Sequence, residues 1–215
     1  MQPRVALAEA FAAVYDIIAL AFLEGPKALR AAGASEDDPP LALWKELEPE
    51  WFATISSMLS RDGDELSVAD KEFQELLVIP VPGRYVPPYA SVHLDGRLWG
   101  PSTLEVVAIF QGEGLVWERL RPGYGEARIF APDHIGVELA FISVLSRRNA
   151  MRGSSLQVSE ALESILGHFV AWVPLFQKAV FQMELAAAPE TRVSNLVDFA
   201  LEVARSDRAR RRSPA

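Results

Sequence analysis

Residues 80–101, PVPGRYVPPYASVHLDGRLWGP, separate two segments that have the apolar spacing of helices. This stretch holds five prolines and three glycines. Each proline removes a backbone donor and biases the residue before it away from helix, which predicts an irregular segment. The stretch is also too apolar for a disordered linker. Because long apolar loops in compact domains are usually functional, we predict a recognition loop, with a packed crossover that plugs the core as the alternative.

Apolar residues recur at helical spacing on both sides of this loop, which predicts an all-α protein. The best strand candidate is Tyr89–Leu94, where apolar and polar residues alternate. A second irregular crossing is expected over residues 115–131. The expected helices cover residues 5–23, 26–32 and 41–59, the last with a break or kink near Glu48 because of Pro49. Ser67 is expected to cap the next helix, and Ser102 and Glu105 are expected to form a capping box for a helix over residues 102–111. The remaining expected helices are a buried helix opening at Pro132, a helix over 154–185 with a break or kink at Pro174, and a helix over 191–205.

The architecture expected from this pattern is a single-domain helical bundle with long irregular Pro/Gly-rich crossing loops. Residues 1–205 are expected to form the domain, and residues 206–215 a basic, disordered tail. At 215 residues the chain is long enough to bury a large core.

The formal net charge is −8, and it is distributed unevenly. Residues 1–75 contain 15 acidic and 6 basic residues, whereas residues 205–212 contain five arginines and one aspartate. An acidic body argues against nucleic acid as the main partner and favours cationic partners.

Cysteine is absent, which excludes disulfides, thiolate zinc sites, cysteine-ligated iron–sulfur clusters and cysteine nucleophiles. The histidines are far apart in sequence, so no metal or other cofactor is expected. Glu9 and Asp16 interrupt the first apolar run, which therefore does not read as a signal peptide. No stretch reaches the roughly 20 uninterrupted apolar residues of a membrane helix. We expect a cytoplasmic protein without stable membrane insertion.

Two groups of residues invite a catalytic interpretation. Ser91, His93 and Asp95 alternate, but no nucleophile-elbow motif surrounds the serine, so a hydrolase triad is not expected. Asp133 and His134 are similar to the doublets of helical metal phosphohydrolases in reversed order, without partner histidines at helical spacing. His134 and Glu138 lie one helical turn apart and are placed to pair, as part of either a site or a capping and packing cluster.

His168 and Trp172 are also one turn apart, as in an ordinary core pair. The residues alone thus indicate no active site, and we expect no enzymatic activity.

Three segments resemble signatures of the TorD/DmsD/NarJ-type redox-enzyme maturation chaperones. They are PPYASVHLDGRLWGPSTLEVVAIFQGEGL (87–115), FAPDHIGVELAFISVL (130–145) and HFVAWVPLF (168–176). The first looks closest to chaperones that accompany type II DMSO-reductase-like dehydrogenases. The chain departs from the family pattern in Phe73-Gln-Glu-Leu76-Leu77, where the family often has aromatic-x-x-Leu-Phe, and in His93, where a Tyr or Trp is usual.

The resemblance implies a cytoplasmic, all-helical, non-enzymatic protein of the TorD-like fold. Such proteins bind the apo catalytic subunit of a molybdenum oxidoreductase, often at its twin-arginine signal peptide, until the cofactor has been inserted, and so prevent premature export. The expected partners are that subunit and its peptide, and the protein itself is expected to be a monomer or a homodimer.

A twin-arginine peptide is cationic and then apolar, so its receptor should offer an apolar groove with carboxylates nearby. We expect Tyr89, Val92 and Trp99 to line this groove, and Asp133 and Glu138 to supply its charge. The complete set of expected binding residues is Tyr85, Pro87, Pro88, Tyr89, Ser91, Val92, His93, Trp99, Pro132, Asp133, His134, Glu138, His168 and Trp172. The alternatives are a helical metal-dependent hydrolase using Asp133 and His134, and a structural subunit of an oxidoreductase complex.

Overall fold

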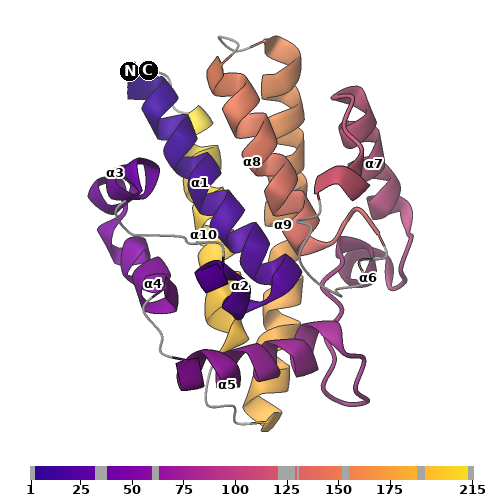
Figure 1. Ribbon diagram of the computed structural model, residues 1–215. Coiled ribbons are helices and arrows are strands. Elements are labelled where there is room, and N and C mark those ends of the chain that lie inside the picture. Colours follow the sequence, from indigo (N-terminus) through magenta and orange to yellow (C-terminus); the bar gives the residue numbers. More distant parts are fainter. Residues whose placement is uncertain are drawn as a thin grey trace.

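Ten α-helices, one π-helical turn and one 3-10 turn make up the regular structure of the described residues in the computed structural model (Figure 1). The structure describes residues 3–31, 38–59, 63–120, 129, 131–151, 155–187 and 192–212. The elements are α1 (Pro3–Glu24), α2 (Pro26–Ala31), α3 (Pro39–Leu47), α4 (Pro49–Leu59), α5 (Gly63–Phe73), the π-turn η1 (Gln74–Val78), α6 (Ala90–Asp95), α7 (Pro101–Gly112), the 3-10 turn η2 (Trp117–Leu120), α8 (Ile135–Met151), α9 (Leu156–Ala187) and α10 (Val193–Arg212). The predicted all-α fold is confirmed.

The centre of the fold is formed by α1, α8, α9 and α10, with α3 and α4 on one flank and α6 and α7 on the other (Figure 1). The first five residues of α8 are buried, as the apolar residues on two of its faces predicted. Gly136 lets α1 approach closely, because a Cβ there would lie 2.7 Å from Leu23. Ser143 fastens the same two helices by donating its hydroxyl to the Ala12 carbonyl at 2.9 Å.

The expected break near Pro49 is confirmed, because α3 ends at Leu47 and α4 begins at Pro49. Two other local predictions are wrong, and of the break or kink expected at Pro174 the break does not occur. α5 begins at Gly63 rather than at Ser67, whose hydroxyl instead bonds the Gly63 carbonyl at 2.8 Å. α8 begins at Ile135, after Pro132. α9 runs through Pro174 without ending, because the buried residues before and after the proline keep the helix packed on the bundle.

The C-terminal arginines are helical, which corrects the expectation of a disordered tail from residue 206 and of a helix end near Arg205. α10 continues to Arg212, and its arginines reach acids on other helices. Arg208 bonds Glu163 of α9 at 2.9 Å, and Arg210 bonds Glu48, between α3 and α4, at 2.7 Å. The helix continues because these opposite charges lie within reach once the bundle has formed.

A buried network underlies these ion pairs. The Tyr15 hydroxyl of α1 donates to the Asp207 carboxylate at 3.2 Å, and Arg211 bonds the other oxygen of Asp207 at 2.7 Å. Burial raises the pKa of Asp207, while Arg211 and Tyr15 act against this rise. The last two turns of α10 therefore belong to the folded domain.

Two helical stretches, Val5–Glu24 and Leu156–Ala187, are long and apolar enough to cross a membrane by length and composition alone. Within the bundle, 56% and 39% of their most apolar windows are buried. Core helices of soluble proteins pass the same test, so the two stretches are weak support for a membrane span.

Candidate functional site

The segment that was expected to be irregular contains a short helix, α6. The strand expected over Tyr89–Leu94 is wrong, because only Tyr89 is extended and the chain is helical from Ala90 to Asp95. Tyr89 forms an isolated antiparallel bridge with His134, and Gly96 ends the helix at φ +71°. The residues that alternate between apolar and polar therefore belong to a short helix whose first residues, Ala90 and Ser91, are buried.

The start of α6 is bound to the start of α8 through three backbone donors. The Ile135 amide donates to the Pro88 carbonyl at 2.9 Å, and the Ala90 amide donates to the Asp133 carbonyl at 3.0 Å. The Ser91 amide donates to the Asp133 carboxylate at 2.7 Å. Asp133 thus supplies, from a distant part of the chain, the acceptor that a capping side chain would provide at the first turn of a helix. It therefore joins two of the segments that the sequence singled out.

His93 joins α6 to α9. Its Nε2 lies 2.8 Å from the Pro87 carbonyl oxygen, which can only accept, so Nε2 carries a proton. The ring stacks on Trp172 with centroids 5.9 Å apart and meets the Phe176 ring at 5.4 Å. Burial lowers the pKa of His93 although the bond to Pro87 acts in the opposite direction. A neutral imidazole between aromatic rings is the form that this packing favours.

Glu138 of α8 is completely buried against α9. It accepts the Trp172 indole N–H at 3.1 Å, and its other oxygen lies 3.4 Å from Nε2 of His168 as an ion pair. His168 also faces Glu105 of α7 at 3.9 Å. Burial raises the pKa of Glu138, and His168 and Trp172 only partly oppose this. Burial alone would lower the pKa of His168, but the charges of Glu138, Glu105 and Asp133 raise it above its ordinary value.

Glu138 therefore points to α9 and not to His134, which corrects the expected pair. His134 has its own contacts: its Nδ1 accepts the Gly136 amide at 3.1 Å, and its ring meets the Tyr89 ring edge-on at 5.1 Å. His168 and Trp172 were expected to form a core pair. Both contact Glu138, Trp172 by a hydrogen bond and His168 by an ion pair.

The catalytic interpretations find no support in this geometry. The Asp95 carboxylate accepts the Ser102 amide at 2.9 Å, and His93 contacts Pro87, so neither is arranged to serve Ser91 in a triad. In the part of the chain that the structure describes, no group of three His, Cys, Asp or Glu residues could hold a metal ion. Asp133 and His134 are engaged in holding the start of α8.

Most of the expected binding residues lie inside the protein and not on its surface. Pro88, Tyr89, Ser91, Pro132, Asp133, His134, Glu138 and Trp172 are buried, Tyr85, Pro87, Val92, His93 and His168 are partly buried, and Trp99 is exposed. Asp133 and Glu138 are both completely buried, so they cannot offer charge to a partner in this conformation. The physical reason is that each carboxylate accepts a hydrogen bond from within the fold, one from Ser91 and one from Trp172. A role of these residues in binding stays a prediction.

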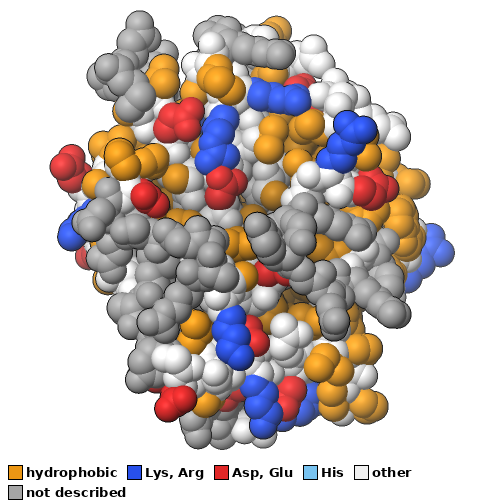
Figure 2. All heavy atoms as spheres, in the orientation of Figure 1, with side chains coloured by type: hydrophobic (Ala, Val, Ile, Leu, Met, Phe, Trp, Pro, Cys, Tyr) orange, Lys and Arg blue, Asp and Glu red, His pale blue; other side chains and the backbone are white. Residues whose placement is uncertain are grey.

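What this part of the chain does expose is an apolar turn, which we define as residues 94–104, from the end of α6 to the first turn of α7. Leu94 and Leu98 are 42% and 38% exposed, Trp99 is 50% exposed and Leu104 is 64% exposed. Hydrophobic side chains also gather along the right-hand edge of the molecule, over α6 and α7 (Figure 2).

The apolar turn has a constrained backbone. Trp99 has φ +60°, in a region that non-glycine residues rarely adopt and that often marks functional sites. Asp95 closes the turn by accepting the Ser102 amide, and Gly100 is required because a Cβ there would lie 2.3 Å from the Asp95 carboxylate. Sequence reasoning missed this role of Asp95. The Ser102 and Glu105 capping box that it expected is not formed, since the N-cap of α7 is Gly100, with no side-chain cap.

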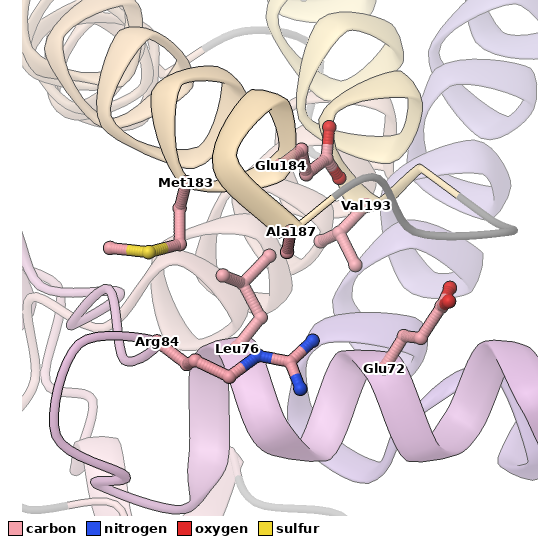
Figure 3. A pocket seen from close by; sticks show the side chains of 7 residues that line it. All are labelled: Glu72, Leu76, Arg84, Met183, Glu184, Ala187 and Val193. Atoms are coloured by element: carbon pink, nitrogen blue, oxygen red, sulfur yellow. The ribbon is translucent and has the colours of Figure 1, made fainter.

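A small pocket lies at the other end of the bundle, where η1 passes the end of α9 and the start of α10 (Figure 3). Its lining residues are Glu72, Leu76, Arg84, Met183, Glu184, Ala187 and Val193. Sequence reasoning placed no site there, because its walls come from two distant parts of the chain, residues 72–84 and residues 183–193.

The comparisons with known proteins fit this arrangement. A family model described as nitrate reductase delta subunit matches residues 44–178, a range that includes the start of α6, the start of α8 and the His168–Trp172 pair. Searches of the curated proteins and of the solved structures found no match. The matched family comprises cytoplasmic maturation chaperones of molybdenum enzymes and not catalytic enzymes. With more than half of its length matched, this chain belongs to the nitrate reductase delta subunit family.

Proposed function

We propose that this protein binds the apo catalytic subunit of a molybdenum oxidoreductase in the cytoplasm, holds it until the cofactor has been inserted, and prevents its premature export. The observation that carries the proposal is membership of a family of molybdoenzyme assembly chaperones over residues 44–178. All three interlocked segments of the candidate site fall within that range.

The apolar turn at residues 94–104 is the surface that we assign to the apo subunit. An incompletely assembled protein exposes apolar surface that its mature form buries. Exposed leucines beside an exposed Trp99 offer a matching surface, and aromatic residues carry a large share of interface energy. The hydrogen bond from the Ser102 amide to Asp95 supports this role, because a turn closed in this way loses less conformational entropy on binding.

The first test is to purify the tagged protein from its native host and to identify what accompanies it. We expect the catalytic subunit of a molybdenum enzyme, without molybdenum. Permanent association with the mature, cofactor-loaded enzyme would instead favour a structural subunit. Purification with no catalytic subunit at all would contradict the proposal.

The surface is tested by a matched pair of double variants. Trp99→Ala with Leu104→Ala truncates the apolar turn, whereas Met151→Ala with Leu156→Ala truncates residues that are 73% and 74% exposed around the α8–α9 connection. We expect the first variant to lose the catalytic subunit while the second retains it, with both proteins melting as the wild type does. Equal retention by both variants would show that the apolar turn is not the contact surface.

A further inference from the structure

We infer that the exposed face of α9 between Ala171 and Leu185 is the contact surface of a homodimer, in which the α9 helices of two copies pack antiparallel as a short coiled coil. This inference goes beyond the proposed function, because it concerns a second copy of this chain and not the client. We call the surface the α9 seam and define it by five exposed residues, Ala171, Leu175, Lys178, Gln182 and Leu185, with Phe181 at its edge. The seam shares no residue with the apolar turn of residues 94–104.

The α9 seam is an apolar face that the described parts of the chain leave open to solvent. Leu175, Phe181 and Leu185 are 46%, 44% and 63% exposed. In the most apolar window of α9, 39% is buried, compared with 56% in the corresponding window of α1. Contiguous exposed apolar surface on a soluble protein marks a place where another molecule binds.

The neighbouring helices are packed on the other faces of α9. Trp172 donates its indole N–H to Glu138 of α8, and the His93 ring of α6 stacks on the same tryptophan. Gln177 donates to Asp198 of α10. α6 and α10 therefore lie on either side of α9, and α8 covers its inner face, which leaves the seam on the outside.

The residues of the seam have the spacing of a coiled coil. Ala171, Leu175, Lys178, Gln182 and Leu185 follow one another at alternating intervals of four and three residues, and all five are exposed. An average interval of 3.5 residues keeps one face of a helix turned toward a partner helix. On a surface helix without a partner, the face opposite the core is ordinarily polar. The pattern therefore indicates that another helix packs here.

The residue types fit a second copy of α9 in antiparallel orientation. When two identical helices pack antiparallel around position 180, Leu175 of each copy lies beside Leu185 of the other, and Lys178 lies beside Gln182. The lysine ammonium can then donate to the side-chain carbonyl of the glutamine. In parallel orientation the two copies of Lys178 would face each other and repel. A single polar layer of this kind fixes the register of a coiled coil.

The charge of the seam also suits a second copy. The chain has a formal net charge of −8, which opposes contact between two copies over most of the surface. Between residues 171 and 187, however, Lys178 is the only exposed ionisable residue. The acid in this range, Glu184, is 5% exposed and accepts the amide and the hydroxyl of Ser194. Two copies can therefore approach at the seam without bringing carboxylates together.

Dimer formation is tested on the full chain by sedimentation velocity over a series of concentrations. The seam is short, so we expect a dimer that dissociates on dilution. Leu175→Glu with Leu185→Glu should be monomeric throughout, whereas Met151→Glu with Leu156→Glu adds the same charge at positions that are 73% and 74% exposed and should dimerise. Both variants should keep the helical circular dichroism of the wild type, because all four side chains are exposed. If the seam instead binds a different protein or a membrane, the wild type will stay monomeric up to about 100 μM, and the inference fails.

The central layer distinguishes antiparallel pairing from a general effect of charge. Gln182→Glu should tighten the dimer about tenfold, because the new carboxylate meets Lys178 of the other copy at two symmetric places, and Gln182→Lys should weaken it by a similar factor. Net charge alone would act in the opposite direction, since added negative charge increases the repulsion between two acidic molecules. Ser159→Glu and Ser159→Lys, at an exposed position outside the seam, measure that general effect. Weakening by Gln182→Glu, or equal effects at the two positions, would refute the antiparallel seam.

The orientation of the two helices is measured by the distance between spin labels. The chain contains no cysteine, so Ala171→Cys provides a single labelling site in the full chain. With a rise of 1.5 Å per residue, antiparallel pairing around position 180 places the two labels about 30 Å apart, whereas parallel pairing places them about 10 Å apart. A distance near 10 Å, or no measurable distance in a sample that sediments as a dimer, would overturn the inference.

Discussion

Replacing Asp133 by alanine is the sharpest test of how α6 is attached to the bundle. The carboxylate accepts the Ser91 amide at 2.7 Å, and both residues are completely buried. Asp133→Ala leaves that amide without its acceptor in a place that water does not reach. Losing a buried hydrogen bond to a charged group costs about 1.5–3 kcal/mol. This exceeds the roughly 0.3–1 kcal/mol of a charge that only interacts with a helix dipole.

The expected loss can be measured by thermal and urea denaturation. For a chain of this size, 1 kcal/mol shifts the melting temperature by about 2–4 °C, so Asp133→Ala should melt about 3–12 °C below the wild type. Ser91→Ala is the matched control. The bond uses the backbone amide of Ser91, and its hydroxyl oxygen has no hydrogen-bond partner among the described residues, so this variant should be neutral or slightly stabilising. A melting temperature of Asp133→Ala within about 1 °C of the wild type, or a larger loss in Ser91→Ala, would refute the reasoning.

Three further outcomes follow from the structure. Tyr89→Ala should cost about as much as Leu139→Ala, about 2–5 kcal/mol in urea denaturation, because both side chains are buried; a near-neutral Tyr89→Ala would contradict this packing. The free energy of unfolding should fall as pH rises, because the pKa of His168 is raised in the folded protein. The stabilisation by protonated His168 is complete below about pH 6.5 and is lost as pH passes through the folded-state pKa. The raised pKa of Glu138 changes the stability in the same direction. Urea midpoints from about pH 6 to about pH 9 measure this fall, which His168→Gln should reduce; a slope unchanged in that variant would assign the effect elsewhere. Deleting residues 206–215 should lower the urea midpoint markedly, since it removes the ion pairs of Arg208 and Arg210 and the buried carboxylate of Asp207. An unchanged midpoint would show that these residues behave as a solvated tail.

The all-α fold could be predicted because helical periodicity is a local property. The apolar stripes of α1, α8 and α9 are set by spacing within each helix, and the break at Pro49 follows from the missing amide of one residue. The strand prediction failed because the partner that decides this segment is distant in sequence. Tyr89–Leu94 alternates as a strand would, but an acceptor from Asp133 makes the segment helical.

The candidate site shows the same division. The residue types at the starts of α6 and α8 and in the His168–Trp172 pair were sufficient to indicate a family resemblance. Their exposure was not predictable, because a carboxylate such as Glu138 is buried only if a donor such as Trp172 meets it inside the fold. The small pocket at the end of α9 was not foreseeable either, since its walls combine α5, η1 and Arg84 with the end of α9 and the start of α10.

The sequence by itself therefore determined the helices, the acidic body and the segments that mark the family, because each depends on residues that are neighbours along the chain. Only the tertiary structure decided that Asp133 and Glu138 hold the bundle together, that Trp99 and its neighbouring leucines remain exposed, and that the C-terminal arginines are part of the domain. The physical reason is that burial and charge pairing depend on which distant groups meet when the helices pack, and a one-dimensional pattern does not contain those distances.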